Sequence, residues 1–255
     1  MKITNIKAMW LRVPIPEAKQ SVSDFGRNDS FNTTLVRVET DAGLVGYGEA
    51  KASVGSIGAQ RALASVIEEE LAPLLVGEDP RDVARLWEVM YNGSRAGHAL
   101  SHGRVFPVLG RRGLTICGAS GIDMALWDIL GRSLDVPVYR LLGGKCRDRL
   151  PAYASGGWAG EEGIGEELLG YIDKGGFRAV KMRVGVMDGS IDASVARVRA
   201  ARAALGPGPK LMCDAHGTCG VPEAKRFCQG VEDCDLYWFE EPCGPDNLAG
   251  TAEVR

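Results

Sequence analysis

Six side chains that could perform acid–base or metal chemistry stand near the C-terminal ends of three short apolar segments. They are Lys181, Arg183, Asp214, His216, Glu240 and Glu241. Carboxylates can hold a hard divalent cation such as Mg²⁺, which stabilises developing negative charge as a Lewis acid. A general base and a nearby cation suit the removal of a proton next to a carboxylate, because that removal creates an enediolate dianion. The set therefore predicts proton abstraction at such a carbon.

Short strands and helices alternate around these residues. Strands are predicted at 150–155, 179–184, 210–216 and 236–241, and helices at 161–174, 190–205 and 222–231. This alternation is typical of βαβ units with right-handed crossovers and a parallel sheet. The carboxyl ends of such strands meet at one edge, where active sites form. A strand period of two places Lys181 with Arg183, and Asp214 with His216, on common faces.

Structural roles are the alternative for the same side chains. Lys181 or Arg183 could simply neutralise Asp214 or Glu240 in a buried ion pair, although buried charges are seldom retained for stability alone. His216 could be a hydrogen-bonding partner that orients Asp214. His98 and His102 are four residues apart, but glycines surround them and no H-E-x-x-H motif is present. We assign these two histidines to a loop.

The first half of the chain predicts an α+β domain. Strand patterns at 2–13, 33–40 and 44–50 indicate a small antiparallel sheet, with Gly43 in a turn. Helices are predicted at 57–75, at 79–91 with Asp79-Pro80 at its start, and at 119–134, with a loop at 93–112. We predict a capping domain over 1–118 and an incomplete barrel domain over 119–255, whose β/α alternation begins after a helix stop at 142–144.

Composition narrows the function classes. The 255 residues are 45% hydrophobic, carry a net charge of −3 and have a pI near 5.7, which disfavours a nucleic-acid or polybasic membrane role. We expect no membrane span and no signal peptide, because charged and polar residues interrupt the apolar runs. Seven cysteines without a C-x-x-C motif favour reduced thiols in a cytoplasmic protein.

The motifs together resemble the enolase superfamily, in its mandelate racemase / muconate lactonizing branch. ETDAGLVGYGEA at 39–50 is similar to the hairpin of that family's capping domain, and 119–144 is similar to its signature helix. VKMRVG, MCDAHGT and WFEEP resemble the second, third and fourth barrel strands. Enzymes of this superfamily use a lysine or histidine base together with Mg²⁺. The resemblance implies a capping domain followed by a TIM-type barrel.

The resemblance also implies residue roles. Asp214 and Glu240 would be Mg²⁺ ligands. Glu241 would be a neighbouring carboxylate that supports these ligands without binding the ion itself. Lys181 and Arg183 occupy the K-x-K positions, but an arginine stays protonated and is a poor base, so we expect Arg183 to bind or polarise substrate. The D-x-H pattern ending at His216 is similar to that of acid-sugar dehydratases, in which the histidine protonates the departing hydroxyl.

The expected reaction is therefore β-elimination of water from an acid sugar, with a small-molecule carboxylate as substrate. A cycloisomerase or racemase of the same superfamily is the neighbouring alternative. Substrate contacts would come from capping-domain loops at 17–31 and 51–58, and the candidates there are Arg27, Asn28, Asp29 and Lys51. The full-length family commonly forms homo-oligomers.

About 110 residues follow Gly144, whereas a complete (β/α)₈ barrel takes about 250. The expected third metal ligand and His–Asp dyad of later strands are not in the sequence. We therefore expect a truncated family member, half of a split protein, or a non-catalytic fragment that associates with another chain. The first is favoured, and we expect the chain alone to be inactive.

Overall fold

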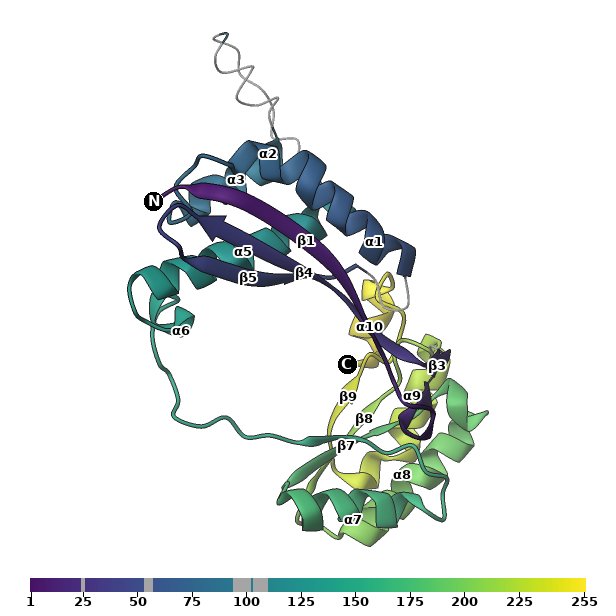
Figure 1. The fold of residues 1–255 in the computed structure, drawn as a ribbon. Coiled ribbons are helices and arrows are strands. Elements are labelled where there is room, and N and C mark those ends of the chain that lie inside the picture. Colours follow the sequence, from purple (N-terminus) through teal and green to yellow (C-terminus); the bar gives the residue numbers. More distant parts are fainter. Residues whose placement is uncertain (24–25, 53–56, 94–101, 103–109) are drawn as a thin grey trace. The chain divides into compact units, whose positions relative to one another are not determined.

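The computed structural model describes residues 1–23, 26–52, 57–93, 102 and 110–255 (Figure 1). The chain forms two compact units, Met1–Cys146 and Arg147–Arg255. This division falls later than the predicted boundary at 118/119, because the long helix that was assigned to the barrel packs on the sheet of the first unit.

Three antiparallel strands form the main sheet of the first unit, in the order β1 (Ile3–Pro14), β4 (Ser30–Thr40) and β5 (Val45–Ala50). Val36 and Val38 are fully buried, and Leu35 lies on the opposite face, as the two-residue period of a strand requires. Gly43 has a φ of +77°, which suits the turn before β5. A hairpin of β2 (Ser21–Ser23) and β3 (Gly26–Asn28) separates β1 from β4.

Helices cover one face of this sheet (Figure 1). The helical segments that contact the sheet are α1 (Ile57–Ser65), the π-helical stretch η2 (Val66–Leu71), α2 (Ala72–Leu75) and α5 (Leu114–Ser133). Helix α3 (Val83–Asn92) contacts α2 and α5, and α6 (Val138–Leu141) contacts α5. A short 3₁₀ turn, η1 (Glu17–Lys19), lies between β1 and β2. The predicted helix at 57–75 is therefore continuous but contains a π segment. The predicted loop at 93–112 lies mostly outside the described residues.

Helix α5 approaches the sheet at backbone contact distance. A Cβ atom on Gly48 would lie 2.0 Å from the carbonyl oxygen of Gly121, and one on Gly46 would lie 2.2 Å from that of Ala125. Among the described residues, α5 is the helix long and apolar enough to cross a membrane by length and composition. Its inner side chains, such as Ile122, are buried in the core, which is how a core helix passes that test.

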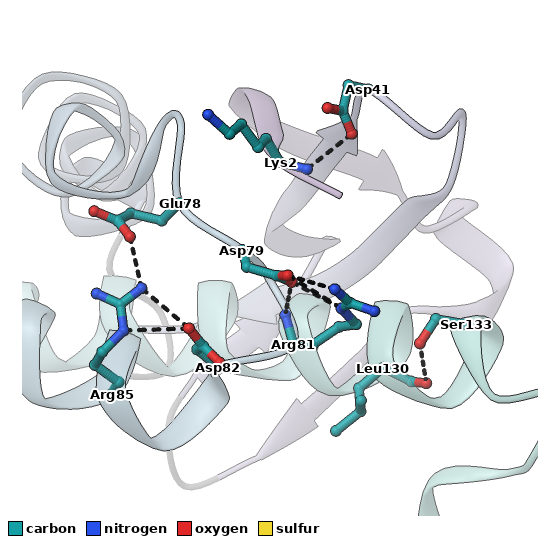
Figure 2. Close-up of polar contacts among 9 residues, drawn as sticks. All are labelled: Lys2, Asp41, Glu78, Asp79, Arg81, Asp82, Arg85, Leu130 and Ser133. Carbon is teal, nitrogen blue, oxygen red and sulfur yellow. Dashed lines mark hydrogen bonds and ion pairs between the residues drawn. The ribbon is translucent and has the colours of Figure 1, made fainter.

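The start of α3 differs from the prediction. Asp79 does not cap a helix that begins at Pro80; its carboxylate accepts hydrogen bonds from the backbone and guanidinium of Arg81 and closes a turn (Figure 2). These bonds hold the pKa of Asp79 well below its usual range. The helix begins three residues later, after Asp82, where Arg85 contacts both Asp82 and Glu78.

A parallel four-stranded sheet forms the core of the second unit, in the order β6 (Ala154–Gly156), β7 (Ala179–Arg183), β8 (Lys210–Asp214) and β9 (Leu236–Glu240). Helices α7 (Ile164–Gly175), α8 (Ile191–Leu205), α9 (Val221–Gly230) and α10 (Leu248–Val254) connect and follow the strands, with 3₁₀ turns η3 (Val186–Asp188) and η4 (Glu232–Cys234). The βαβ prediction is confirmed. Strand β6 is shorter than predicted. It begins at Ala154, and residues 150–153 before it are exposed and outside the sheet.

Candidate active site

The sheet of the second unit brings five of the six predicted site residues together at the carboxyl edge of its strands. They are Lys181, Arg183, Asp214, His216 and Glu240. Arg183, Asp214 and Glu240 are direct neighbours in the strand register, each as the last residue of its strand. Because the strands are parallel, their carboxyl ends coincide. Lys181 lies two residues earlier on β7, and His216 lies two residues after the end of β8.

The ammonium of Lys181 joins the two predicted metal-binding carboxylates. Its Nζ lies 3.1 Å from Oδ2 of Asp214 and 2.8 Å from Oε2 of Glu240. The lysine and aspartate side chains are 10% and 9% exposed, and the glutamate side chain is 34% exposed. Burial opposes the charge on Lys181, but the hydrogen bonds and charges of Glu240 and Asp214 outweigh it and raise the pKa of the lysine. Lys181 is therefore held as a cation.

Arg183 forms a second ion pair with Asp214. Its Nη1 lies 2.8 Å from Oδ1 of Asp214 and donates to the Asp214 carbonyl oxygen at 3.3 Å. The arginine side chain is only 3% exposed. Both cations thus adopt the ion-pair arrangement that was the alternative interpretation of this strand. That arrangement does not by itself exclude a role in chemistry, because buried charges of both signs gather at this edge.

His216 reaches Asp214 through a turn and not through strand alternation. Strand β8 ends at Asp214, and His216 has a φ of +47°, so the predicted continuation of the strand to residue 216 is wrong. The backbone N–H of His216 donates to Oδ1 of Asp214 at 2.9 Å, and its Nε2 lies 3.6 Å from Oδ2. The side chain is 26% exposed, which leaves part of the imidazole open to solvent.

Glu241 lies just beyond β9 and, unlike Glu240, is placed in a turn after the strand. It is exposed and has a φ of +43°, and its carbonyl oxygen accepts a hydrogen bond from Gly217 at 2.7 Å. The backbone contact ties the turn after β9 to the turn after β8. Glu241 thus helps to fix the shape of this edge through its main chain.

Aromatic residues around the cluster were not among the predicted site residues. Trp238 donates from Nε1 to Oε2 of Glu240 at 3.1 Å, and Tyr153 places its ring 5.8 Å from Nζ of Lys181. The two rings also meet edge to face at 5.3 Å. A sequence signal for Trp238 exists, since it is two residues before Glu240 and so shares its face of the strand. No such signal marks Tyr153, which precedes β6.

The other candidates belong to the first unit or fall outside the described residues. Arg27, Asn28 and Asp29 make local hydrogen bonds around the β2–β3 hairpin. Lys51 is exposed after β5. His102 is exposed in a turn, and His98 lies outside the described residues. The cysteines are free thiols.

The donor set suits a hard cation in part. Asp214 and Glu240 supply oxygen atoms that converge on one point, and this point already carries the positive charge of Lys181. Within the described ranges, no group of three or more histidine, cysteine, aspartate or glutamate residues could hold a metal ion. Mg²⁺ is commonly bound by one or two carboxylates together with water and substrate oxygens, so Asp214 and Glu240 would supply two of its ligands.

Fold and site define a class of proteins in which an α+β cap precedes a β/α barrel with charged residues at the carboxyl ends of its strands. Residues 6–143 match the family described as mandelate racemase / muconate lactonizing enzyme, N-terminal domain. Residues 163–255 match the description enolase C-terminal domain-like. The chain belongs to this family of the enolase superfamily.

Curated relatives and solved structures extend the match. The arabinonate dehydratase of Saccharolobus solfataricus is 35% identical over 85% of this chain and 54% of its own length. The D-galactarolactone cycloisomerase of Agrobacterium fabrum is 32% identical over 100% of this chain and 62% of its own length. A Bradyrhizobium enolase complexed with magnesium and mandelic acid is 32% identical, with a TM-score of 0.80, and the match covers 100% of this chain and 64% of that one. The chain therefore spans between about half and two-thirds of these proteins.

Proposed function

We propose that this chain contributes to Mg²⁺-dependent proton abstraction next to a carboxylate, and that the reaction is the dehydration of an acid sugar. The observation that carries the proposal is the Lys181–Asp214–Glu240 cluster at the carboxyl edge of a family-matched sheet. The resemblance to an arabinonate dehydratase over 85% of the chain supports the substrate class. We further propose that the protein acts in the cytoplasm and as a homo-oligomer.

Asp214 and Glu240 would hold the metal ion, with the main chain of Glu241 supporting the adjoining turn. Mg²⁺, when bound, supplies Lewis-acid stabilisation of the negative charge on the substrate carboxylate. For this to happen, the ammonium of Lys181 must move from between the two carboxylates toward the substrate. There it would stabilise the negative charge that develops on the substrate, together with the guanidinium of Arg183.

His216 is the proposed general acid of the elimination. A partly exposed imidazole beside Asp214 can donate a proton to a departing hydroxyl group near neutral pH. Neither Lys181 nor Arg183 is the proposed base. The pKa of Lys181 is raised by its carboxylate partners, and an arginine remains protonated. The proton would go to the His–Asp dyad that the family resemblance implies on later strands, outside this sequence.

A cycloisomerase is the second candidate, because the D-galactarolactone cycloisomerase matches along the entire chain. The two reactions share proton abstraction and differ in what leaves. A dehydratase releases water and forms a 2-keto-3-deoxy acid, whereas a cycloisomerase gives an isomer of its substrate.

The test is a screen of sugar acids and their lactones with Mg²⁺, with both water-loss and isomer products measured by mass spectrometry. We expect no product from the chain alone. When the remaining barrel strands of a relative are supplied, we expect a mass loss of water from an aldonate, abolished by EDTA and reduced at least about 10³-fold in Asp214→Asn and Glu240→Gln. Lys225→Met, on a surface ion pair with Glu253, is the control and should retain activity. An isomer without mass loss would establish the cycloisomerase. The absence of both products when those strands are supplied would favour a non-catalytic fragment that associates with another chain.

A further inference from the structure

The loop that follows β6 is held from both sides of its backbone. The N–H groups of Gly157, Trp158 and Ala159 all donate to the carboxylate of Glu167, at 3.0, 2.9 and 2.8 Å. Tyr171 donates to the same carboxylate at 2.7 Å. Despite partial burial, these four bonds lower the pKa of Glu167. The carboxylate therefore fixes three successive residues of the loop.

Arg197 of helix α8 binds the carbonyl side of the same loop. Its guanidinium donates to the carbonyl oxygens of Ala159 and Gly157 at 2.9 Å each, and to that of Arg183 at 2.9 Å. The side chain is 8% exposed and also pairs with Asp188. One buried guanidinium thus connects the loop after β6 to the end of β7, which carries Arg183 in the candidate site.

The residue presented by this arrangement is Trp158. Its side chain is 46% exposed, although the backbone on either side of it is fully hydrogen-bonded. The guanidinium carbon of Arg183 lies 5.6 Å from the centre of its ring. A large aromatic side chain that is both exposed and held in place is unusual for a surface loop, because exposed loop residues commonly lack such restraint.

Trp158 and Arg183 line a recess of about 340 Å³ together with Met187 and Glu161. This volume lies in the range of small-molecule sites. The recess is bordered by two arginines, Arg183 and Arg197, and by two carboxylates, Glu161 and Asp188. Because Arg197 and Asp188 form an ion pair, the recess has no strong excess of charge. An indole face attracts the positively polarised C–H groups of a ligand, and Glu161 can accept hydrogen bonds from hydroxyl groups.

We propose that Trp158 contacts the hydroxyl-bearing carbon chain of the substrate and so sets chain-length specificity, and that Glu167 and Arg197 are positioning residues for it. The inference rests on the proposed function for its ligand class, a polyhydroxy acid. It adds a recognition site for the part of the ligand remote from the carboxylate.

The test measures binding by calorimetry in the full chain with Mg²⁺ present. The probes are arabinonate, which carries a polyol chain, and lactate, which has the same α-hydroxy acid group without that chain. We expect Trp158→Leu to weaken arabinonate binding at least about tenfold and lactate binding less than twofold. Glu167→Gln should also weaken the binding of arabinonate more than that of lactate. It should shift the fluorescence emission of Trp158, which is obtained by subtracting the spectrum of a protein that carries Trp158→Phe. Trp87→Phe, in the first unit, is the control.

Equal weakening of both probes, unchanged arabinonate affinity in Trp158→Leu, or no arabinonate binding by the wild type would overturn the inference. A Trp158 emission unchanged by Glu167→Gln would overturn the positioning role. The proposed function is judged separately by turnover. Selective binding, with no product even when the remaining barrel strands are supplied, would leave the inference standing and refute the dehydratase. Turnover with an unchanged KM in Trp158→Leu would do the reverse.

Discussion

At the scale of single residues, the central feature is one ammonium group that contacts two carboxylates. Lys181 lies within hydrogen-bonding distance of both Asp214 and Glu240, and two of the three side chains are about nine-tenths buried. Removing one partner of a buried ion pair leaves uncompensated charge, which costs more than the pair itself contributes. Without Lys181, Glu240 would lose its ammonium partner and Asp214 would keep only Arg183. Two carboxylates with one cation fewer are a stronger site for a divalent cation than the lysine-bridged pair.

We therefore predict that Lys181→Met is destabilised by roughly 3 kcal/mol in EDTA, at the lower end of the usual range because Glu240 is partly exposed. Mg²⁺ should recover most of that loss and should stabilise the variant more than the wild type. Urea unfolding with and without Mg²⁺ measures both effects. Lys225→Met removes an exposed ion pair and should change stability by less than about 1 kcal/mol. Equal Mg²⁺ responses of Lys181→Met and wild type would contradict the prediction.

Residue types and strand period were enough to predict which side chains gather at this edge. They could not predict which charges pair, because pairing depends on side-chain rotamers and strand register. His216 illustrates the limit. Sequence alternation placed it beside Asp214 for the wrong reason, since a left-handed backbone turn brings it there. Trp158 was missed because its placement depends on Glu167 and Arg197, which lie 9 and 39 residues away in the sequence.

At the scale of elements, close backbone approach joins α5 to β5. Gly48→Ala would place a methyl group 2.0 Å from the Gly121 carbonyl oxygen, so helix and strand must separate. We predict a loss of about 3 kcal/mol or more in the free energy of unfolding, measured with urea. Gly58→Ala in α1 is the matched control, because nothing lies within 4 Å of its added methyl group. This control should be neutral or more stable by up to about 1 kcal/mol. Similar losses in both variants would count against the close-packing account.

The Glu167 carboxylate predicts a pH dependence. Its pKa is lowered from an ordinary value of 4.5, so its stabilisation is complete above that value and is lost as the pH falls below it. The stability difference between wild type and Glu167→Gln should be roughly 1–3 kcal/mol at pH 6 and should shrink toward pH 3. Thermal unfolding across that range measures it. Glu166→Gln, at the exposed neighbouring position, should follow the wild type. A constant difference would show that Glu167 is not ionised in the loop.

Element boundaries were predicted less well than element types. Asp79-Pro80 has the composition of a helix start, yet the Asp79 carboxylate binds Arg81 and delays the helix to Val83. Helix α5 begins at Leu114, five residues before its predicted start, after Gly113 with a φ of +63°. Both outcomes depend on local hydrogen bonding and backbone conformation that periodicity does not reveal.

At the scale of the whole molecule, the first unit has a hydrophobic core of its own that includes α5 residues Ile122, Leu126 and Ile129. We predict that a fragment of residues 1–146 unfolds cooperatively in urea and retains near-ultraviolet circular dichroism. A fragment of residues 1–118, cut at the boundary predicted from sequence, lacks those side chains and should unfold without a cooperative transition. Cooperative unfolding of the shorter fragment would favour the predicted boundary. Sequence could not decide this, because an apolar helix of this kind can pack against either neighbouring sheet.

The Lys181 ammonium has a consequence for how the protein is made. In small zinc domains, folding must wait for the metal, because metal binding supplies the free energy of folding. Here the chain encodes its own counter-ion, and the newly synthesised second unit can form its sheet before any Mg²⁺ arrives. Magnesium supply would then control how much of the second unit carries the metal ion and not how much of it is folded. In cells grown with little magnesium, the metal-free protein should accumulate in a folded form that can bind Mg²⁺ later.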